Sequence, residues 1–501
     1  MKKIGVPRNV LFSSLSWFVP LGITFLVTPL IVRGLGHEQY GLYALVQGFI
    51  AYSFNFNVGR ALTKYISTFR AKNETGRIGE ALTATLLVNL LVGVVSAGLL
   101  IFFAGWLVVD LLKIPAPMQR QALLAFYVAS ATLLPMMLGF VFNAVPQALQ
   151  RFDIYSLVML GGGAFNLIGN AILVLLGHGV ITLLLWNLLG SSLVCLVFMY
   201  YTRVLLPDVP IAWHVSRDLL LGVIRFSASV AAYQILANIL LLFERSWIAR
   251  ALGTEAVTFY VVPMTMAMYI HAFIGSLTLV MFPMASEAHA QSDLERLRLI
   301  YSRAIKYISM IVVFICVTLC VCSYQLLTAW VGIEIADHSS RVLIIQSIAF
   351  SILAVGIVPW QMADGLGRPS FNALLVVVWL LIAVPLMIVL TPKLGIQGTA
   401  WGRLFSISTI PVYALLIERW ALHRNLWGFW RNTVAVLVLA GAIAGVAEYF
   451  MLRAGLSGWL NLAAAGTAGG LAYLGCLHLT RFISDDEQAW LRGFVMRAVT
   501  P

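Results

Sequence analysis

Long apolar runs separated by short polar connections make up most of this chain. About fourteen of these runs are long enough, at roughly 20 residues each, to cross the hydrocarbon core of a bilayer as α-helices. Because the connections between them are short, no separate soluble domain fits. The pattern therefore predicts an all-α integral membrane protein, with spans centred near residues 20, 50, 95, 132, 165, 191, 237, 270, 313, 352, 380, 408, 442 and 469.

A short motif after the first span recurs 217 residues later, and a second pair of segments shows the same offset. A Gly-Val and a Gly-Ile pair further along align at an offset of 216. Similar anchors at nearly one offset indicate that a six-helix unit has been duplicated. The aligned segments are IVRGLGHE (31–38) with IARALGTE (248–255), ALQRFD (148–153) with GLGRPS (365–370), and Gly179-Val180 with Gly395-Ile396.

The duplication predicts two lobes and a C-terminal addition. Residues 1–210 would form the first lobe with spans 1–6, and residues 211–422 the second lobe with spans 7–12. Residues 423–501 would hold the last two helices and a cytoplasmic tail. Since six is an even number, both lobes have the same orientation and a pseudo-twofold axis along the membrane normal relates them. Such a protein is most simply a transporter, with its substrate path between the lobes.

Composition agrees with this prediction. The chain is 61% hydrophobic and 10% charged, whereas soluble domains are about 25% charged. Lysine and arginine are about three times more frequent in the connections on the side of the N-terminus, so both termini are predicted to be cytoplasmic. This rule also explains the net charge of +12 without nucleic acid. All five cysteines lie in apolar runs and are expected to be packing residues, so neither a metal site nor a cofactor is predicted.

Three arginines within the predicted spans are not repeated by the duplication. Charged groups inside a bilayer are costly and usually face protein or water, so a cation in only one lobe is a candidate for substrate binding. Arg60, Arg245 and Arg403 are therefore predicted to hold an anionic substrate. The aligned pairs are Arg60 with Leu277, Arg245 with Thr28, and, at the offset of 216, Arg403 with Asn187.

Uncharged polar residues continue the helix faces of all three arginines, with Thr399 and Ser406 on the face of Arg403. Asn57 precedes Arg60 by three residues, and Gln234 and Asn238 precede Arg245 by eleven and seven residues, spacings that place each set on one helix face. These stripes predict a hydrated cavity of positive potential, with the amides as further substrate contacts. Two alternatives remain open: Arg60 extends to the cytoplasmic headgroups, or Arg245 forms an ion pair with Glu244 or with another helix.

Glu244 and Asp364 are the candidates for ion coupling. An acidic residue at membrane depth can carry a proton or a sodium ion through a transport cycle. The alternatives are an ion pair between Glu244 and Arg245, and a cap by Asp364 at the cytoplasmic end of its helix.

The residues RGLGHEQYGL (33–42), followed by NVGRAL (57–62), resemble the amino-terminal signature of Wzx-type oligosaccharide flippases. These proteins form the polysaccharide-transporter branch of the multidrug/oligosaccharidyl-lipid/polysaccharide exporter superfamily. The second lobe is similar in ARALGTEAVTFY (249–260) and GIQGTAWGRL (395–404), and the likeness covers roughly residues 5–420. The chain departs from the family pattern at Arg60, where a small residue is usual, and at Glu244-Arg245, where an aspartate is usual.

The resemblance implies transfer of an undecaprenyl-diphosphate-linked oligosaccharide from the cytoplasmic to the periplasmic leaflet, by alternating access, for cell-surface polysaccharide biosynthesis. It implies a bacterial inner-membrane location and no enzyme activity. The implied partners are the lipid-linked glycan and the bilayer, with a polysaccharide polymerase and other assembly proteins as further candidates and no nucleic acid. One alternative is an ion-coupled multidrug or metabolite antiporter of the same superfamily, which would present acidic and aromatic groups. The other is a membrane glycosyltransferase or polymerase, which would need a larger outer loop or paired catalytic carboxylates.

Overall fold

The computed structural model is almost entirely helical in the residues it describes, and it has no strand among them. The described residues are 6–53, 59–72, 74, 76–207, 209, 215–278, 281–423 and 427–483.

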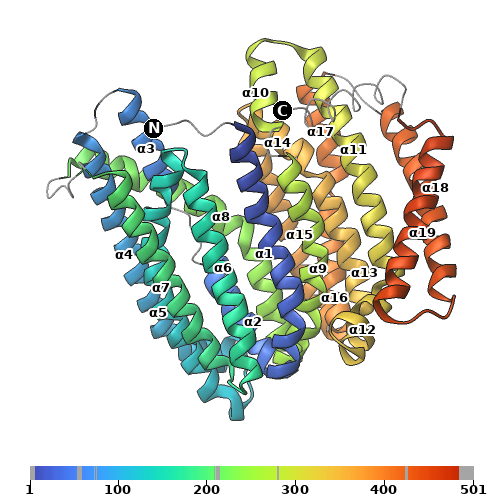
Figure 1. Cartoon of the computed structure of the whole chain (residues 1–501), viewed down its shortest axis with the longest axis horizontal. Coiled ribbons are helices and arrows are strands. Elements are labelled where there is room, and N and C mark those ends of the chain that lie inside the picture. Colours follow the sequence, from blue (N-terminus) through green and yellow to red (C-terminus); the bar gives the residue numbers. More distant parts are fainter. Residues whose placement is uncertain are drawn as a thin grey trace. The chain divides into compact units, whose positions relative to one another are not determined.

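The helices follow one another through short connections (Figure 1). In chain order they are α1 (Val6–Leu35), α2 (His37–Ser53), α3 (Gly59–Ala71), α4 (Gly76–Trp106), the π-helix η1 (Leu107–Leu111), α5 (Ala116–Ala148), α6 (Phe152–Leu175), α7 (Val180–Leu205), α8 (Arg217–Leu252), α9 (Thr254–Thr278), α10 (Met281–Ala290), α11 (Leu294–Val321), α12 (Ser323–Trp330), α13 (Ile333–Val355), α14 (Ile357–Gly365), α15 (Pro369–Leu394), α16 (Ile396–Ile407), α17 (Ile410–Ala421), α18 (Trp427–Leu452) and α19 (Gly458–Leu479).

Within the described residues, 11 helical stretches are long and apolar enough to cross a membrane. The predicted all-α class of a multi-pass membrane protein is confirmed. The count of about fourteen spans is not confirmed and stays a prediction. Every predicted centre lies in a helix except residue 408, which lies in the short break between α16 and α17.

The helix bounds repeat with the same offset as the sequence anchors. Gly36 ends α1 and Gly253 ends α8, 217 residues apart, and both have a left-handed backbone, with φ of 76° and 92°. Glycine adopts this conformation without the steric penalty of a Cβ atom. The recurring Leu-Gly of the opening motif is therefore a helix stop that precedes the next helix in each copy.

The second anchor also marks a helix boundary in each copy. Gln150 precedes α6 and Gly367 precedes α15, and both have positive φ, 57° and 73°. Upstream of them, α5 covers the same positions as α13 and α14 together, shifted by 217 residues at both ends. These shared bounds support the inferred duplication at the level of elements as well as residues.

The chain forms two compact units, and each combines segments that are distant in sequence. The first unit comprises Met1–Val261 and Val384–Thr399, and the second comprises Val262–Ala383 and Ala400–Pro501. The predicted lobe boundaries at 210/211 and 422/423 stay predictions.

In the first unit, α4, α5 and α7 pack side by side, and α1 packs along α6 (Figure 1). Two glycines of the opening motif allow close approach between helices. A Cβ at Gly34 would lie 1.8 Å from Cγ1 of Val174 on α6, and a Cβ at Gly41 would lie 1.8 Å from the Thr254 carbonyl oxygen at the start of α9. A larger residue at Gly41 would have to displace the backbone at the start of α9, and one at Gly34 would have to displace the Val174 side chain.

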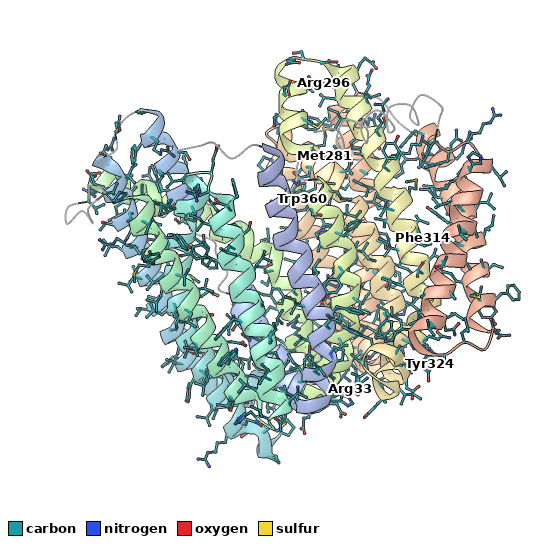
Figure 2. All side chains as sticks on the ribbon, in the orientation of Figure 1. Arg33, Met281, Arg296, Phe314, Tyr324 and Trp360 are labelled. Atoms are coloured by element: carbon teal, nitrogen blue, oxygen red, sulfur yellow. The ribbon has the colours of Figure 1, made fainter. Side chains whose placement is uncertain are left out.

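In the second unit, α11 runs along most of the helix layer, with Arg296 near one end and Tyr324 just beyond the other (Figure 2). The α18–α19 hairpin packs against it. Gly441 and Gly445 on α18 face valines of α11, because a Cβ at either position would meet Val313 or Val317 at 3.1–3.2 Å. Small residues spaced by four thus allow the hairpin to dock closely, as is common between membrane helices.

Candidate functional site

Arg245 lies on α8 in the first unit with only 8% of its surface exposed. Its Nη1 donates to the Ala44 carbonyl oxygen on α2 at 2.8 Å, and its Nη2 donates to the Tyr52 hydroxyl at 3.2 Å. The guanidinium also lies 4.9 Å from the centre of the Tyr52 ring, a distance suited to a cation–π interaction. The side chain is therefore held across a helix–helix contact.

One face of α2 forms the surface on which Arg245 lies. Ala44, Gly48 and Tyr52 recur every four residues, so they lie along the same side of the helix. A Cβ at Gly48 would be 2.9 Å from Nη1 and 3.0 Å from Cδ of Arg245. The glycine leaves room for the guanidinium to reach the helix backbone.

The partners of Arg245 are all neutral. Within the described part of the chain its interactions are with a carbonyl, a hydroxyl and an aromatic ring, and it forms no ion pair there. The adjacent Glu244 is fully buried but is not its ion-pair partner. A buried cation without a counter-charge is strongly unfavourable, and this cost identifies Arg245 as a residue of interest for binding anions.

Arg403 lies on α16 in the second unit and is 3% exposed. Its guanidinium is 5.1 Å from the centre of the Phe350 ring on α13. An aromatic ring stabilises a cation that has lost part of its hydration. The Arg403 side chain is therefore enclosed by protein within the second unit.

Of the other predicted substrate contacts, the structure describes the side chain of Asn238. Asn57 and the side chains of Arg60 and Gln234 lie outside the described residues. Asn238 is half-buried on α8, two turns before Arg245 and therefore on the same side of that helix.

The two predicted coupling acids occupy different surroundings. Glu244 is fully buried within α8. Asp364, in the last turn of α14, is half-buried and accepts a hydrogen bond from Nδ2 of Asn372 at 2.8 Å. The same amide also donates to the Trp360 carbonyl at 3.2 Å, and its oxygen accepts from the Tyr413 hydroxyl. Asp364 therefore belongs to a network that joins α14, α15 and α17.

Two further buried carboxylates were not among the predicted site residues. Glu418 on α17 accepts hydrogen bonds from the Tyr301 hydroxyl at 3.1 Å and from the Trp430 indole. Glu448 on α18 accepts from the Thr318 hydroxyl at 2.6 Å. Both are fully buried. The sequence shows that both glutamates lie within apolar runs, and this could have marked them as candidates. It does not show which residues on distant helices donate hydrogen bonds to them.

A neutral polar cluster in the first unit was likewise not among the predicted site residues. It consists of Tyr43 and Gln47 on α2, Asn170 on α6 and Asn187 on α7. The Tyr43 hydroxyl accepts from Asn187 at 3.1 Å, from Asn170 at 3.3 Å and from Gln47 at 3.4 Å. Nδ2 of Asn170 also donates to Oδ1 of Asn187 at 2.9 Å. A search guided by charge passes over such a group, although the isolated amides within apolar runs are its signal.

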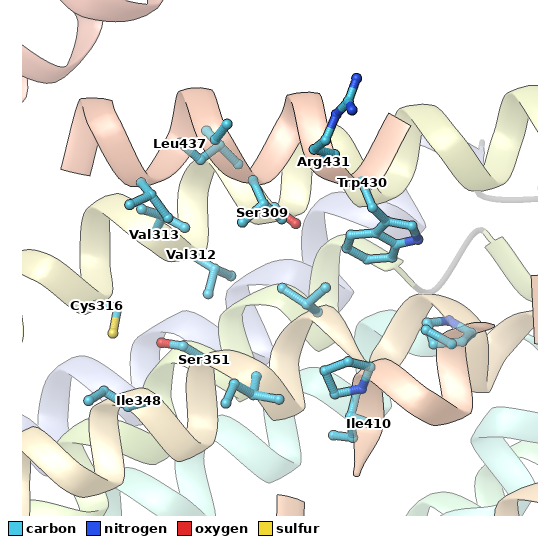
Figure 3. A pocket seen from close by; sticks show the side chains of 18 of the residues that line it. Ser309, Val312, Val313, Cys316, Ile348, Ser351, Ile410, Trp430, Arg431 and Leu437 are labelled. Atoms are coloured by element: carbon cyan, nitrogen blue, oxygen red, sulfur yellow. The ribbon is translucent and has the colours of Figure 1, made fainter. Parts of the chain in front are cut away.

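An apolar cavity of about 670 Å³ lies in the second unit between α11, α13, α17 and α18. Its walls are mostly aliphatic, as Val312, Val313 and Leu437 illustrate in Figure 3. Arg431 borders the cavity, but its guanidinium points away from it in this view. Such a space suits a hydrocarbon chain better than a sugar or an ion.

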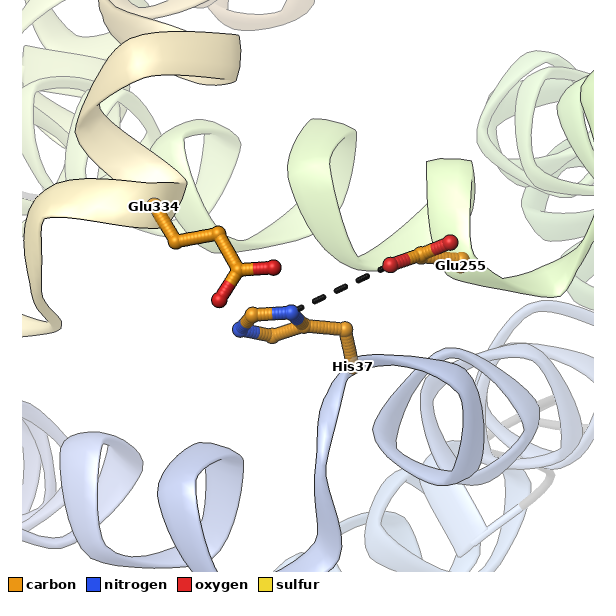
Figure 4. A group of neighbouring side chains, drawn as sticks. All are labelled: His37, Glu255 and Glu334. Atoms are coloured by element: carbon orange, nitrogen blue, oxygen red, sulfur yellow. Dashed lines mark ion pairs between the residues drawn. The ribbon is translucent and has the colours of Figure 1, made fainter.

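The opening motif lies at the turn from α1 into α2, at an end of the first unit. His37 Nδ1 is 4.0 Å from Oε1 of Glu255, an ion pair only when the histidine is protonated (Figure 4). The Thr258 hydroxyl donates to the His37 carbonyl at 2.5 Å. These contacts tie the start of α2 to the start of α9, so the motif serves architecture.

Comparison with known proteins agrees with this fold. A curated relative from Shigella flexneri, named "Putative O-antigen transporter", is 21% identical over 400 residues, which is 79% of this chain and 94% of the relative. A solved lipid II flippase, MurJ, in an inward closed conformation superimposes with a TM-score of 0.72 at 13% identity, over 94% of this chain and 98% of that chain.

A multidrug resistance transporter of the MATE family, solved in an inward-facing conformation, gives a TM-score of 0.71 at 19% identity, over 81% of this chain and 98% of that chain. These two likenesses show that the chain shares the fold of both membrane proteins. The resemblance noted in the sequence is confirmed by the curated relative together with the family match that follows. The model of a family described as "Polysaccharide biosynthesis protein" matches residues 30–337. That match covers more than half of the sequence, so the chain belongs to the polysaccharide biosynthesis protein family.

Proposed function

We propose that the chain carries an undecaprenyl-diphosphate-linked oligosaccharide from the cytoplasmic to the periplasmic leaflet of the bacterial inner membrane. Family membership supports a role in polysaccharide biosynthesis, and the names of the O-antigen transporter and the lipid II flippase support transport of a lipid-linked glycan. The proposal includes alternating access between two lobes, cytoplasmic termini and no enzyme activity. A polysaccharide polymerase and other assembly proteins are proposed partners.

The observation that carries the proposal is the burial of Arg245 among neutral partners. Removing a cation from water costs several kcal/mol even after relaxation. A diphosphate supplies the missing negative charge and accepts the paired N–H donors of a guanidinium. We therefore assign Arg245 to the diphosphate, with Arg60 and Arg403 as further cations.

The remaining predicted residues keep their roles within the proposal. Asn57, Gln234 and Asn238 are assigned to polar parts of the substrate, since they continue the faces of Arg60 and Arg245. Glu244 and Asp364 are assigned to the coupling ion. The apolar cavity beside α18 supports a lipid-linked substrate, because a polyprenyl chain is the part of such a molecule that prefers an aliphatic wall.

The test is complementation of a strain that lacks the gene, with Arg245→Gln as the variant. Glutamine keeps hydrogen-bonding capacity toward Ala44 and Tyr52 but removes the charge. We expect surface glycan to fall at least tenfold and lipid-linked oligosaccharide to accumulate in the cytoplasmic leaflet.

Arg250→Gln is the matched control. Arg250 lies on the same helix and also donates to backbone carbonyls, those of Asp110 at 2.6 Å and Leu111 at 3.0 Å. At equal membrane abundance, this variant should keep at least half of the surface glycan. Normal surface glycan in the deletion strain, without cytoplasmic accumulation, would overturn the proposed function. Full export by Arg245→Gln would show that Arg245 does not bind the diphosphate, and the proposed function would stand.

A further inference from the structure

The neutral cluster of Tyr43, Gln47, Asn170 and Asn187 has an unequal balance of donors and acceptors. A tyrosine hydroxyl has one hydrogen to donate and two lone pairs to accept with. Three amide groups donate toward the Tyr43 oxygen, one more than its two lone pairs can accept, so the cluster has a surplus of donors and the accepting capacity of this oxygen is used. Its own hydrogen is donated to no residue that the structure describes.

The complementary deficit lies on Asn170. This side chain is 2% exposed, and its Oδ1 has no hydrogen-bond partner among the described residues. A buried polar atom left in this state costs about 1–3 kcal/mol. Because Nδ2 of the same amide is 3.3 Å from the Tyr43 hydroxyl, the donor that lacks an acceptor and the acceptor that lacks a donor lie close together. A group that both donates and accepts, as an alcohol does, satisfies both.

The four side chains of the cluster include no carboxylate and no basic group, so nothing in it pairs with a charged ligand. The corresponding position in the second copy is charged. Tyr43 aligns with Tyr260 at the offset of 217, whereas Asn187 aligns with Arg403 at the offset of 216. The first copy thus has a neutral amide at the position where the second copy has a cation. Neutral donors and acceptors select hydroxyl-rich, uncharged groups, and cations select anions.

We infer that the cluster on α2, α6 and α7 is a subsite that binds hydroxyl groups of an uncharged sugar. This inference rests on the proposed function and deepens it, because it assigns the glycan and the diphosphate to different residues. The Tyr43 hydroxyl donates to a sugar oxygen, and the Asn170 carbonyl accepts from a sugar hydroxyl. Gln47 and Asn187 are half-buried and hold Tyr43 in place at the edge of the subsite.

The test compares two probes bound to the purified full chain in lipid nanodiscs. The first probe is undecaprenyl diphosphate, and the second is undecaprenyl diphosphate that carries a neutral hexose trisaccharide. We expect the wild-type chain to bind the second probe about tenfold more tightly, a difference of about 1.4 kcal/mol. Tyr43→Phe removes only the hydroxyl, and it should abolish most of this advantage while affinity for the first probe changes less than twofold.

Two further variants keep the test decisive. Gln47→Leu changes the half-buried edge of the cluster and should reduce the trisaccharide advantage about threefold even if Tyr43→Phe folds poorly. Tyr155→Phe on α6 is the matched control, because this half-buried tyrosine packs against Phe198 in an apolar cluster. It should leave both affinities unchanged.

The outcomes separate the inference from the proposed function. If Tyr43→Phe and Gln47→Leu keep the full trisaccharide advantage, or weaken both probes equally, the cluster is structural and the inference is wrong while the function stands. If the wild-type chain binds neither probe, the proposed function fails and the inference fails with it. A loss confined to the trisaccharide probe supports both.

Discussion

Gly48 leaves the space through which the Arg245 side chain reaches α2. Gly48 faces the guanidinium, and a methyl group added at this position would lie 2.9 Å from Nη1 and 3.0 Å from Cδ. Few Cβ atoms in folded proteins have neighbours this near, so either the arginine or the helix must move when a side chain is added. The reason for a glycine at position 48 is therefore the side chain of an arginine almost 200 residues away in the sequence.

Gly48→Ala should destabilise the chain by about 1–3 kcal/mol and lower glycan export, because the Arg245 guanidinium is displaced from the Ala44 carbonyl. Thermal unfolding in detergent and the complementation assay measure the two effects. In the Arg245→Gln background the same substitution should have a much smaller effect, since the two residues share one contact.

Gly98→Ala provides the control for that measurement. Gly98 is exposed on α4, and a Cβ there would meet nothing within 4 Å. Alanine also favours helix more than glycine does, so this variant should be neutral or slightly stabilising. Equal losses from Gly48→Ala with and without Arg245 would show that the contact is not the reason for the glycine.

At the scale of elements, buried polar contacts join the α18–α19 hairpin to α11. Glu448 on α18 accepts from Thr318 on α11 at 2.6 Å, and Tyr473 on α19 donates to the Met310 carbonyl at 2.8 Å. Gly469 allows the approach of Glu448, because a Cβ there would lie 2.4 Å from its Cγ. Apolar packing between membrane helices is not driven by water, so such hydrogen bonds contribute to which helices associate.

Thr318→Val should therefore loosen the hairpin. The substitution keeps the shape of the side chain but leaves Glu448 Oε1 without its donor, at a cost of about 1–3 kcal/mol. Hydrogen exchange should become faster in α18 and α19 while the first unit is unaffected. Thr467→Val is the control, since Thr467 is exposed on α19 and its hydroxyl donates to the Ala463 carbonyl within its own helix. Faster exchange in the control, or none in Thr318→Val, would contradict the tether.

Helix positions could be predicted from the sequence, because a run of apolar residues is a local property. The ends of several helices were predictable as well, since Gly36 and Gly253 mark stops in a repeated motif. The partners of the buried polar groups were not. Tyr52 lies far from Arg245 in sequence, and only folding brings Tyr43 on α2 next to Asn170 on α6 and Asn187 on α7. The sequence therefore indicated which residues were unusual, whereas the three-dimensional fold was needed to show what each one contacts.

The whole molecule has a predicted orientation that follows from the distribution of its positive charges. The turn before α11 is followed by Arg296 and Arg298, and the positive-inside rule places it in the cytoplasm. The turns at Lys113 and Ser457 belong to the opposite side in this scheme, because an odd number of predicted spans separates each of them from the α10–α11 turn.

Single cysteines introduced into a chain without its five native cysteines test this orientation. Lys113→Cys and Ser457→Cys should react with a membrane-impermeant maleimide in intact spheroplasts. Ser292→Cys, in the α10–α11 turn, should react only after the membrane is permeabilised. The opposite pattern would invert the molecule, and the proposed direction of glycan transfer would then conflict with the charge distribution. A mixed pattern would instead show that the predicted number of spans between these turns is wrong.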